Sequence, residues 1–112
     1  MEKIVQQTLL FDFYGELLTK HQQQIYEDVV CNDMSCSEVA LQQGVSRQGV
    51  HDLIRRCNRQ LEEYEAKLHL VERFLDIQLK VRDMRRILQE APEGLPEVQE
   101  LIRISDEILE EL

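Results

Sequence analysis

The chain has 112 residues, the usual size of one domain, and its 43% apolar and 31% charged residues are typical of a folded protein. Its 13 basic and 22 acidic residues give a formal net charge of −9, which argues against general binding of polyanions. Only 4 Gly and 2 Pro occur, too few to punctuate a many-stranded β-sandwich.

Helical periodicity begins at the N-terminus, where apolar residues recur at three-to-five spacing over residues 4–18. Gly15 lies near the end of this first predicted helix. Thr19 is placed to cap a second helix, because its side-chain oxygen can accept a free backbone N–H. Asn32 and Asp33 are predicted to end that second helix.

Two further helices are predicted on either side of a single glycine. Ser35 and Glu38 have the spacing of a capping box, which opens a short helix that stops at Gly44. Ser46 then starts the next helix. No strand candidate appears anywhere in the chain, so the predicted fold is all-α.

Residues 36–55 have the spacing of a helix-turn-helix. Ala40 is small where the two helices must cross, and Gly44 supplies the positive φ of the tight turn. The apolar residues Val45, Val50 and Leu53 are expected to hold the second helix against the first.

The negative charge is distributed unevenly, and one window is basic. Residues 1–60 carry a net charge of −2 and residues 61–112 a net charge of −7, but residues 44–60 carry +3. These basic residues lie on the second helix of the predicted motif, whose outward positions would enter a major groove. Arginine and glutamine pair with base edges, and flanking arginines reach phosphates. The candidate nucleic-acid-binding residues are therefore Ser46, Arg47, Gln48, His51, Arg55, Arg56 and Arg59.

The second half of the chain is predicted to form long helices. No Gly or Pro lies between residues 50 and 91, so residues 47–90 are expected to form one helix, or two that meet near residue 70. A turn at residues 91–96 precedes a last helix with an apolar stripe over residues 98–112. This stripe and the apolar residues of the preceding helices are predicted to form a dimer interface through residues 61–112. The alternative is an intramolecular hairpin in which they bury each other.

The chain is accordingly divided into two regions within what is effectively one domain. Residues 1–60 hold the N-terminal helices and the helix-turn-helix. Residues 61–112 form an acidic helical arm, whose predicted role is interaction or dimerisation.

Three segments together resemble the YlxM family of small bacterial proteins, which are similar to region 4 of sigma-70 factors in their helix-turn-helix. These segments are LLFDFYGELLT (residues 9–19), SEVALQQGVSRQGVHDLIRR (residues 37–56) and LEEYEAKL (residues 61–68). The resemblance implies DNA binding at the candidate positions. It also implies an accessory role in the signal recognition particle pathway, with the GTPase Ffh and the particle's small RNA as partners. Gly49 and His51 depart from the expected Ala and Tyr, which reduces the side-chain surface that would contact bases.

The sequence favours a binding protein over an enzyme. It contains no Gly-rich phosphate loop, no spaced nucleophile and base, and no metal-ligand cluster, so no cofactor is expected. Cys31, Cys36 and Cys57 are interpreted as small apolar fillers in a reducing, cytoplasmic protein. No apolar run approaches the length of a membrane span. The two functional hypotheses are an accessory factor of the signal recognition particle and a sequence-specific DNA-binding regulator.

Overall fold

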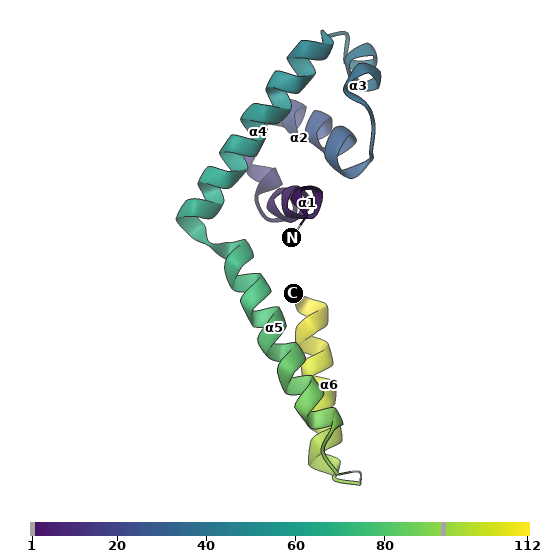
Figure 1. The fold of residues 1–112 in the computed structure, drawn as a ribbon, viewed down its shortest axis with the longest axis vertical. Coiled ribbons are helices and arrows are strands. Elements are labelled where there is room, and N and C mark those ends of the chain that lie inside the picture. Colours follow the sequence, from purple (N-terminus) through teal and green to yellow (C-terminus); the bar gives the residue numbers. More distant parts are fainter. Residues whose placement is uncertain (1, 93) are drawn as a thin grey trace. The chain divides into compact units, whose positions relative to one another are not determined.

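The computed structural model describes residues 2–92 and 94–112, and it confirms the all-α prediction for them, since no strand occurs among these residues. They divide into two compact units, one that ends at Val71 and one that comprises Glu72–Leu112 (Figure 1). The α-helices along the chain are α1 (Lys3–Tyr14), α2 (Lys20–Tyr26), α3 (Cys36–Gln43), α4 (Arg47–Leu68), α5 (Leu70–Gln89) and α6 (Pro96–Glu111).

The second helix begins and ends where the sequence predicts, whereas the first ends at Tyr14, before the end of the predicted apolar pattern. A 3₁₀ turn (Gly15–Leu17) follows α1, and Thr19 then caps α2. The cap is a complete capping box, because the Thr19 hydroxyl accepts the Gln22 N–H at 3.2 Å and the Gln22 side chain accepts the Thr19 N–H at 3.0 Å. One π-helical turn (Glu27–Cys31) extends α2 as far as Asn32.

An aromatic cluster joins α1 to α2 and explains the glycine at the end of α1. The rings of Phe11 and Tyr26 stack with their centroids 5.3 Å apart. A Cβ atom added to Gly15 would lie 2.9 Å from the Phe11 ring. Gly15 is therefore required by the close approach of this ring, while its φ of −57° is an ordinary helical value.

The predicted helix-turn-helix is formed by α3 and α4 around a small core. Val39, Ala40 and Val50 are buried against Ile25 of α2, and Leu53 packs beside them. Gly44 has the expected positive φ, at 67°. The expectation for Val45 is wrong: this residue is 42% exposed.

The cap of α3 is simpler than the predicted capping box. The Ser35 hydroxyl accepts the Glu38 N–H at 3.1 Å, as expected. The same hydroxyl donates to the Glu38 carboxylate at 3.2 Å, so the donor to this carboxylate is the Ser35 side chain and not the Ser35 backbone N–H of a capping box.

The long helical region is two helices, in agreement with a break near residue 70. His69 ends α4 in the left-handed conformation with a φ of 56°. The start of α5 is held by groups from earlier in the chain: the Leu70 N–H donates to the Tyr14 hydroxyl at 3.1 Å, and the Val71 N–H donates to Glu65 Oε1 at 3.0 Å. The Tyr14 hydroxyl in turn donates to the same carboxylate at 2.5 Å. These contacts fix where α4 stops.

Residues 61–71 lie in the first unit, although the sequence assigns them to the arm. Leu61 is fully buried, and Val71 is buried as well. The compact units therefore meet eleven residues later than the predicted boundary.

The second unit is a hairpin in which α6 runs back beside α5 (Figure 1). Val81 and Ser105 are its buried residues, and Arg85 Nε lies 3.1 Å from the Asp106 carboxylate. Gly94 supplies a positive φ of 92° in the predicted turn; Glu93, which that prediction includes, lies outside the described residues. The intramolecular hairpin is thus present, but many apolar side chains stay exposed on it, namely Ile77, Leu79, Met84, Ile87, Leu95, Leu101, Ile104 and Leu112.

The cysteines differ from one another in their surroundings. Cys57 is fully buried, and burial raises the pKa of its thiol to about 11. Cys36 packs against the helix-turn-helix core. Cys31 is exposed, so its interpretation as an apolar filler is wrong. Within the described part of the chain, no helix is long and apolar enough to cross a membrane.

Candidate nucleic-acid interface

The start of α4 is built by the turn that precedes it. Gly44 reverses the chain, and the Ser46 hydroxyl accepts the Gly49 N–H at 2.9 Å as the N-cap. Gly49 is the third residue of α4, so it lies in the first turn of this helix. A Cβ atom at Gly49 would lie 3.1 Å from the capping hydroxyl. The N-terminus of α4 therefore presents backbone N–H groups and the positive end of the helix dipole.

Six of the seven candidate side chains form two rows along α4, because residues four apart lie on the same face of a helix. The first row is Arg47, His51, Arg55 and Arg59, and all four are exposed. The second row contains Gln48, Asp52 and Arg56, which are exposed as well. The seventh candidate, Ser46, is the N-cap at the beginning of the rows.

The two rows differ in charge. The first row contains three arginines and a histidine but no acid, and it extends over about 18 Å at 1.5 Å per residue. In the second row, Gln48 Nε2 donates to the Asp52 carboxylate at 3.1 Å. Asp52 thus occupies one side-chain N–H of Gln48 and adds a negative charge, so the first row is the more favourable surface for phosphate.

Other groups near the motif modify this surface. Nδ1 of His51 lies 3.8 Å from the thiol sulfur of Cys36, which connects the first row to the beginning of α3. The Ser46 hydroxyl, although it caps α4, keeps its own hydrogen to donate.

The arginines of α4 are available for a ligand. Among the described residues, no carboxylate lies within ion-pair distance of Arg47, Arg55, Arg56 or Arg59. The arginines of the second unit contrast with this, since Arg85 pairs with Asp106 and Arg103 pairs with Glu100 and Glu107. An arginine with no internal partner in an acidic chain is expected to attract an external anion.

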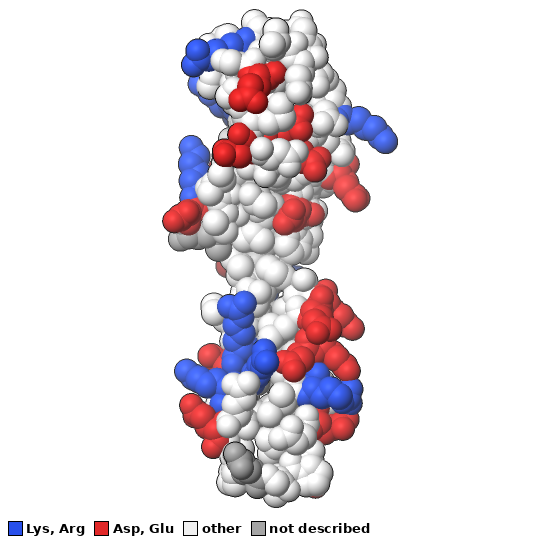
Figure 2. Space-filling model, turned by 90° about the vertical axis from the view of Figure 1, so that its right-hand side faces the viewer, with Lys and Arg blue, Asp and Glu red and all other residues white. Residues whose placement is uncertain are grey.

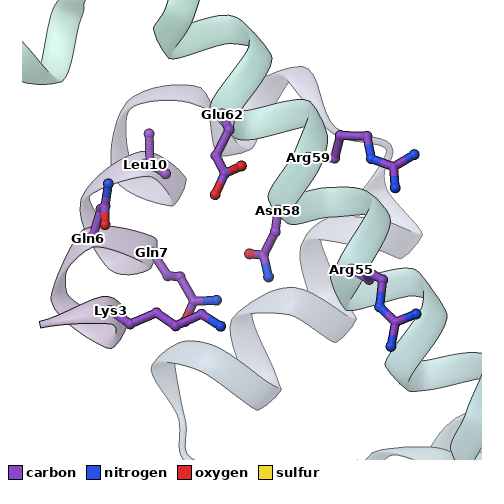
Figure 3. A pocket seen from close by; sticks show the side chains of 8 residues that line it. All are labelled: Lys3, Gln6, Gln7, Leu10, Arg55, Asn58, Arg59 and Glu62. Carbon is purple, nitrogen blue, oxygen red and sulfur yellow. The ribbon is translucent and has the colours of Figure 1, made fainter.

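A hollow of about 290 Å³ adjoins the first row, between α1 and α4 (Figure 3). No local pattern predicts this site, because α1 and α4 are far apart in the chain and only the packing of the first unit brings them together. Two residues of the first row line it with six residues that were not predicted. The lining comprises Lys3, Gln6, Gln7, Leu10, Arg55, Asn58, Arg59 and Glu62.

Figure 2 shows another face of the first unit, viewed from the right-hand side of Figure 1. On that face acidic side chains lie across the middle and reach both edges, whereas the basic ones lie towards the edges. This face is therefore a poor candidate for binding a polyanion.

Comparison with known proteins supports the helix-turn-helix assignment. Residues 1–107 match the family described as "UPF0122: Putative helix-turn-helix protein, YlxM / p13 like". The chain belongs to this family. The match extends well beyond the three segments on which the sequence resemblance rests.

Relatives within the family match along most of the chain. A UPF0122 protein of Thermoanaerobacter sp. (strain X514) is 39% identical over 107 residues, which cover 90% of this chain and 92% of that protein. One from Bacillus mycoides (strain KBAB4) is 34% identical over 108 residues, covering 96% of this chain and 98% of the relative. A third, from Acetivibrio thermocellus, is 47% identical over 75 residues, or 67% and 64% of the two chains.

Proposed function

We propose that this protein is a non-enzymatic, nucleic-acid-binding regulator that uses the exposed face of α4. The observation that carries the proposal is the first row, in which three arginines follow the capped N-terminus of the second helix of the motif and have no ion-pair partner among the residues that the structure describes. Membership of a helix-turn-helix family supports it.

In the proposed mode of binding, the beginning of α4 enters a groove. Arg47 and Gln48 lie in the first turn, where a recognition helix meets base edges. Arg55 and Arg59 are further along the same face, at the distance of flanking phosphates. Arg56 completes the contact from the second row, and Ser46 and His51 contribute polar contacts at the beginning of the helix.

For the pathway, we propose an accessory role in the signal recognition particle, with the particle's small RNA and Ffh as partners. The support is the family resemblance together with the division of charge. The arginines of α4 would meet the RNA. Helix α6, with six acidic residues and one basic residue, would meet a basic surface of Ffh.

We also propose that the hairpin of the second unit self-associates into a dimer. Two helices alone bury little apolar surface, and this hairpin leaves Ile77, Met84 and Ile87 on one stripe of α5 exposed. The charges are complementary between two copies, because residues 72–89 carry five basic and three acidic residues whereas α6 is strongly acidic. On the face drawn in Figure 2, basic and acidic patches of this unit alternate.

Sedimentation over a range of protein concentrations tests the dimer. We expect the unaltered chain to dimerise, Ile87→Glu to weaken association, and Gln89→Glu, an added charge on the other side of α5, to have little effect. A monomer at high concentration would exclude the dimer.

A sequence-specific DNA-binding regulator is the second candidate function. The observation that favours it is the spacing of Arg47, Gln48 and His51 in the first turns of α4, where a helix-turn-helix reads bases. A dimer would place two such helices on one duplex.

Titration against the particle's small RNA, Ffh and random duplex DNA at several salt concentrations separates these functions. The accessory role predicts binding to Ffh or the RNA. Binding restricted to duplex DNA, and lost in Arg47→Ala and Arg55→Ala, would favour the DNA regulator. An absence of binding to all three ligands would contradict both functions.

A further inference from the structure

We propose that the hollow between α1 and α4 binds a phosphate group of a nucleic-acid strand, so that the interface of the first unit extends from the helix-turn-helix onto α1. This inference rests on the proposed nucleic-acid binding but adds a separate site, since α1 is not part of the motif.

The charge of the lining supports an anionic ligand. Lys3, Arg55 and Arg59 contribute three positive charges and Glu62 one negative charge, in a chain whose net charge is −9. None of these three cations forms an ion pair within the described part of the chain. Positive charge is therefore gathered at the hollow and along its rim, with Lys3 inside and the two arginines at the edge.

One amide of the lining, Asn58, is oriented by a hydrogen bond. The Tyr26 hydroxyl donates to Asn58 Oδ1 at 2.6 Å. The tyrosine hydroxyl engages the oxygen of this amide, and the amide nitrogen, which can only donate, has both of its hydrogens to offer a ligand. An oxyanion accepts such hydrogen bonds, whereas a cation would be repelled.

The arrangement of the side chains is visible in Figure 3. Lys3 and Gln7 extend from α1 towards α4, while Asn58 and Glu62 extend from α4 into the space between the two helices. The guanidinium groups of Arg55 and Arg59 point away from α1, beyond the rim of the hollow. One phosphate would lie between Lys3 and Asn58, and its neighbours along the strand would meet the two arginines.

The size of the hollow fits this ligand. A volume of about 290 Å³ corresponds to roughly ten water molecules at about 30 Å³ each, which leaves room for a phosphate group with its sugar and some water. The negative charge of Glu62 repels the phosphate and limits affinity. Removal of this charge should therefore strengthen binding, whereas removal of a positive charge should weaken it.

Three variants test the site by their effect on binding of a short random-sequence DNA duplex and of an RNA hairpin. Lys3→Gln is expected to reduce the slope of log K against log salt by about one phosphate contact. Asn58→Asp replaces the donor with an acceptor yet keeps an oxygen for Tyr26, and it should weaken binding at least several-fold. Glu62→Gln should strengthen it.

The control is Lys20→Gln, which removes an exposed positive charge from α2 outside the hollow and should change binding less than Lys3→Gln. Circular dichroism establishes that each variant is folded. If Arg47→Gln abolishes binding while Lys3→Gln, Asn58→Asp and Glu62→Gln behave as the unaltered chain, the hollow is not a site and the proposed function stands. If the unaltered chain binds neither probe, the proposed function itself fails.

The source of the phosphate is tested by the side-chain NMR signals of Asn58 at constant ionic strength. A shift on addition of duplex or RNA, without one on addition of inorganic phosphate, supports the proposal. A shift on addition of inorganic phosphate, with no shift on addition of either nucleic acid, would overturn the proposal in favour of a free anion.

Discussion

At the scale of single residues, two positions of the FDFYG segment have structural roles that the sequence does not reveal. Gly15 is small because the Phe11 ring occupies the space where its side chain would lie. Tyr14 is buried, and its hydroxyl joins Glu65 to the beginning of α5. The periodicity of the segment predicts a helix, but the reason for each residue depends on partners far away in the chain.

Gly15→Ala should lower the free energy of unfolding by about 1–3 kcal/mol, because the added methyl group overpacks the Phe11–Tyr26 stack. Thermal or urea unfolding measures this loss. The same substitution in a Phe11→Leu background should cost less, since the ring that causes the clash is gone. An equal loss in both backgrounds would contradict the steric explanation.

Cys57 should make stability depend on alkaline pH. Burial raises the pKa of its thiol from 9.0 to about 11, so in this interval the unfolded chain loses the proton while the folded chain keeps it. Folding is therefore favoured below pH 9, and the free energy of unfolding falls as the pH rises towards 11. Urea unfolding at several pH values should show a steeper fall for the unaltered chain than for Cys57→Ala; parallel profiles would contradict this.

At the scale of elements, the sequence predicts most boundaries, because caps and turns are local. Thr19, Ser46 and Gly44 act as expected. For the break between α4 and α5 the sequence predicts only one of two alternatives, because no Gly or Pro marks it. His69 is the residue that takes the left-handed conformation there. The decisive contacts come from Tyr14, which is 56 residues from Leu70, and no local pattern contains that information.

Tyr14→Phe should loosen the beginning of α5. The Leu70 N–H loses its acceptor, and the loss of this part-buried hydrogen bond should cost about 0.5–1.5 kcal/mol, while the Val71 N–H keeps Glu65. Amide hydrogen exchange should therefore accelerate more at Leu70 than at Val71. Unchanged exchange at Leu70 would show that the hydroxyl does not hold this helix end.

At the scale of the whole molecule, a net charge of −9 and a nucleic-acid-binding role are compatible because charge is segregated along the chain. The basic window of the sequence becomes the two rows of α4, and the candidate residues could be predicted because they lie on one helix of a recognisable motif. The hollow could not be predicted, since Lys3 and Asn58 come together only through tertiary packing. The location of the acids also becomes clearer: much of the negative charge of the second unit is on α6.

The comparison of Arg55→Gln with Arg56→Gln tests the central claim most directly. Both variants remove one exposed arginine from adjacent positions of α4, so the change in net charge and the helix that carries it are the same. If the first row is the binding face, Arg55→Gln should weaken nucleic-acid binding several-fold more than Arg56→Gln, and it should reduce the salt slope by about one contact. Equal effects of the two substitutions, or a larger effect of Arg56→Gln, would contradict the assignment of the first row.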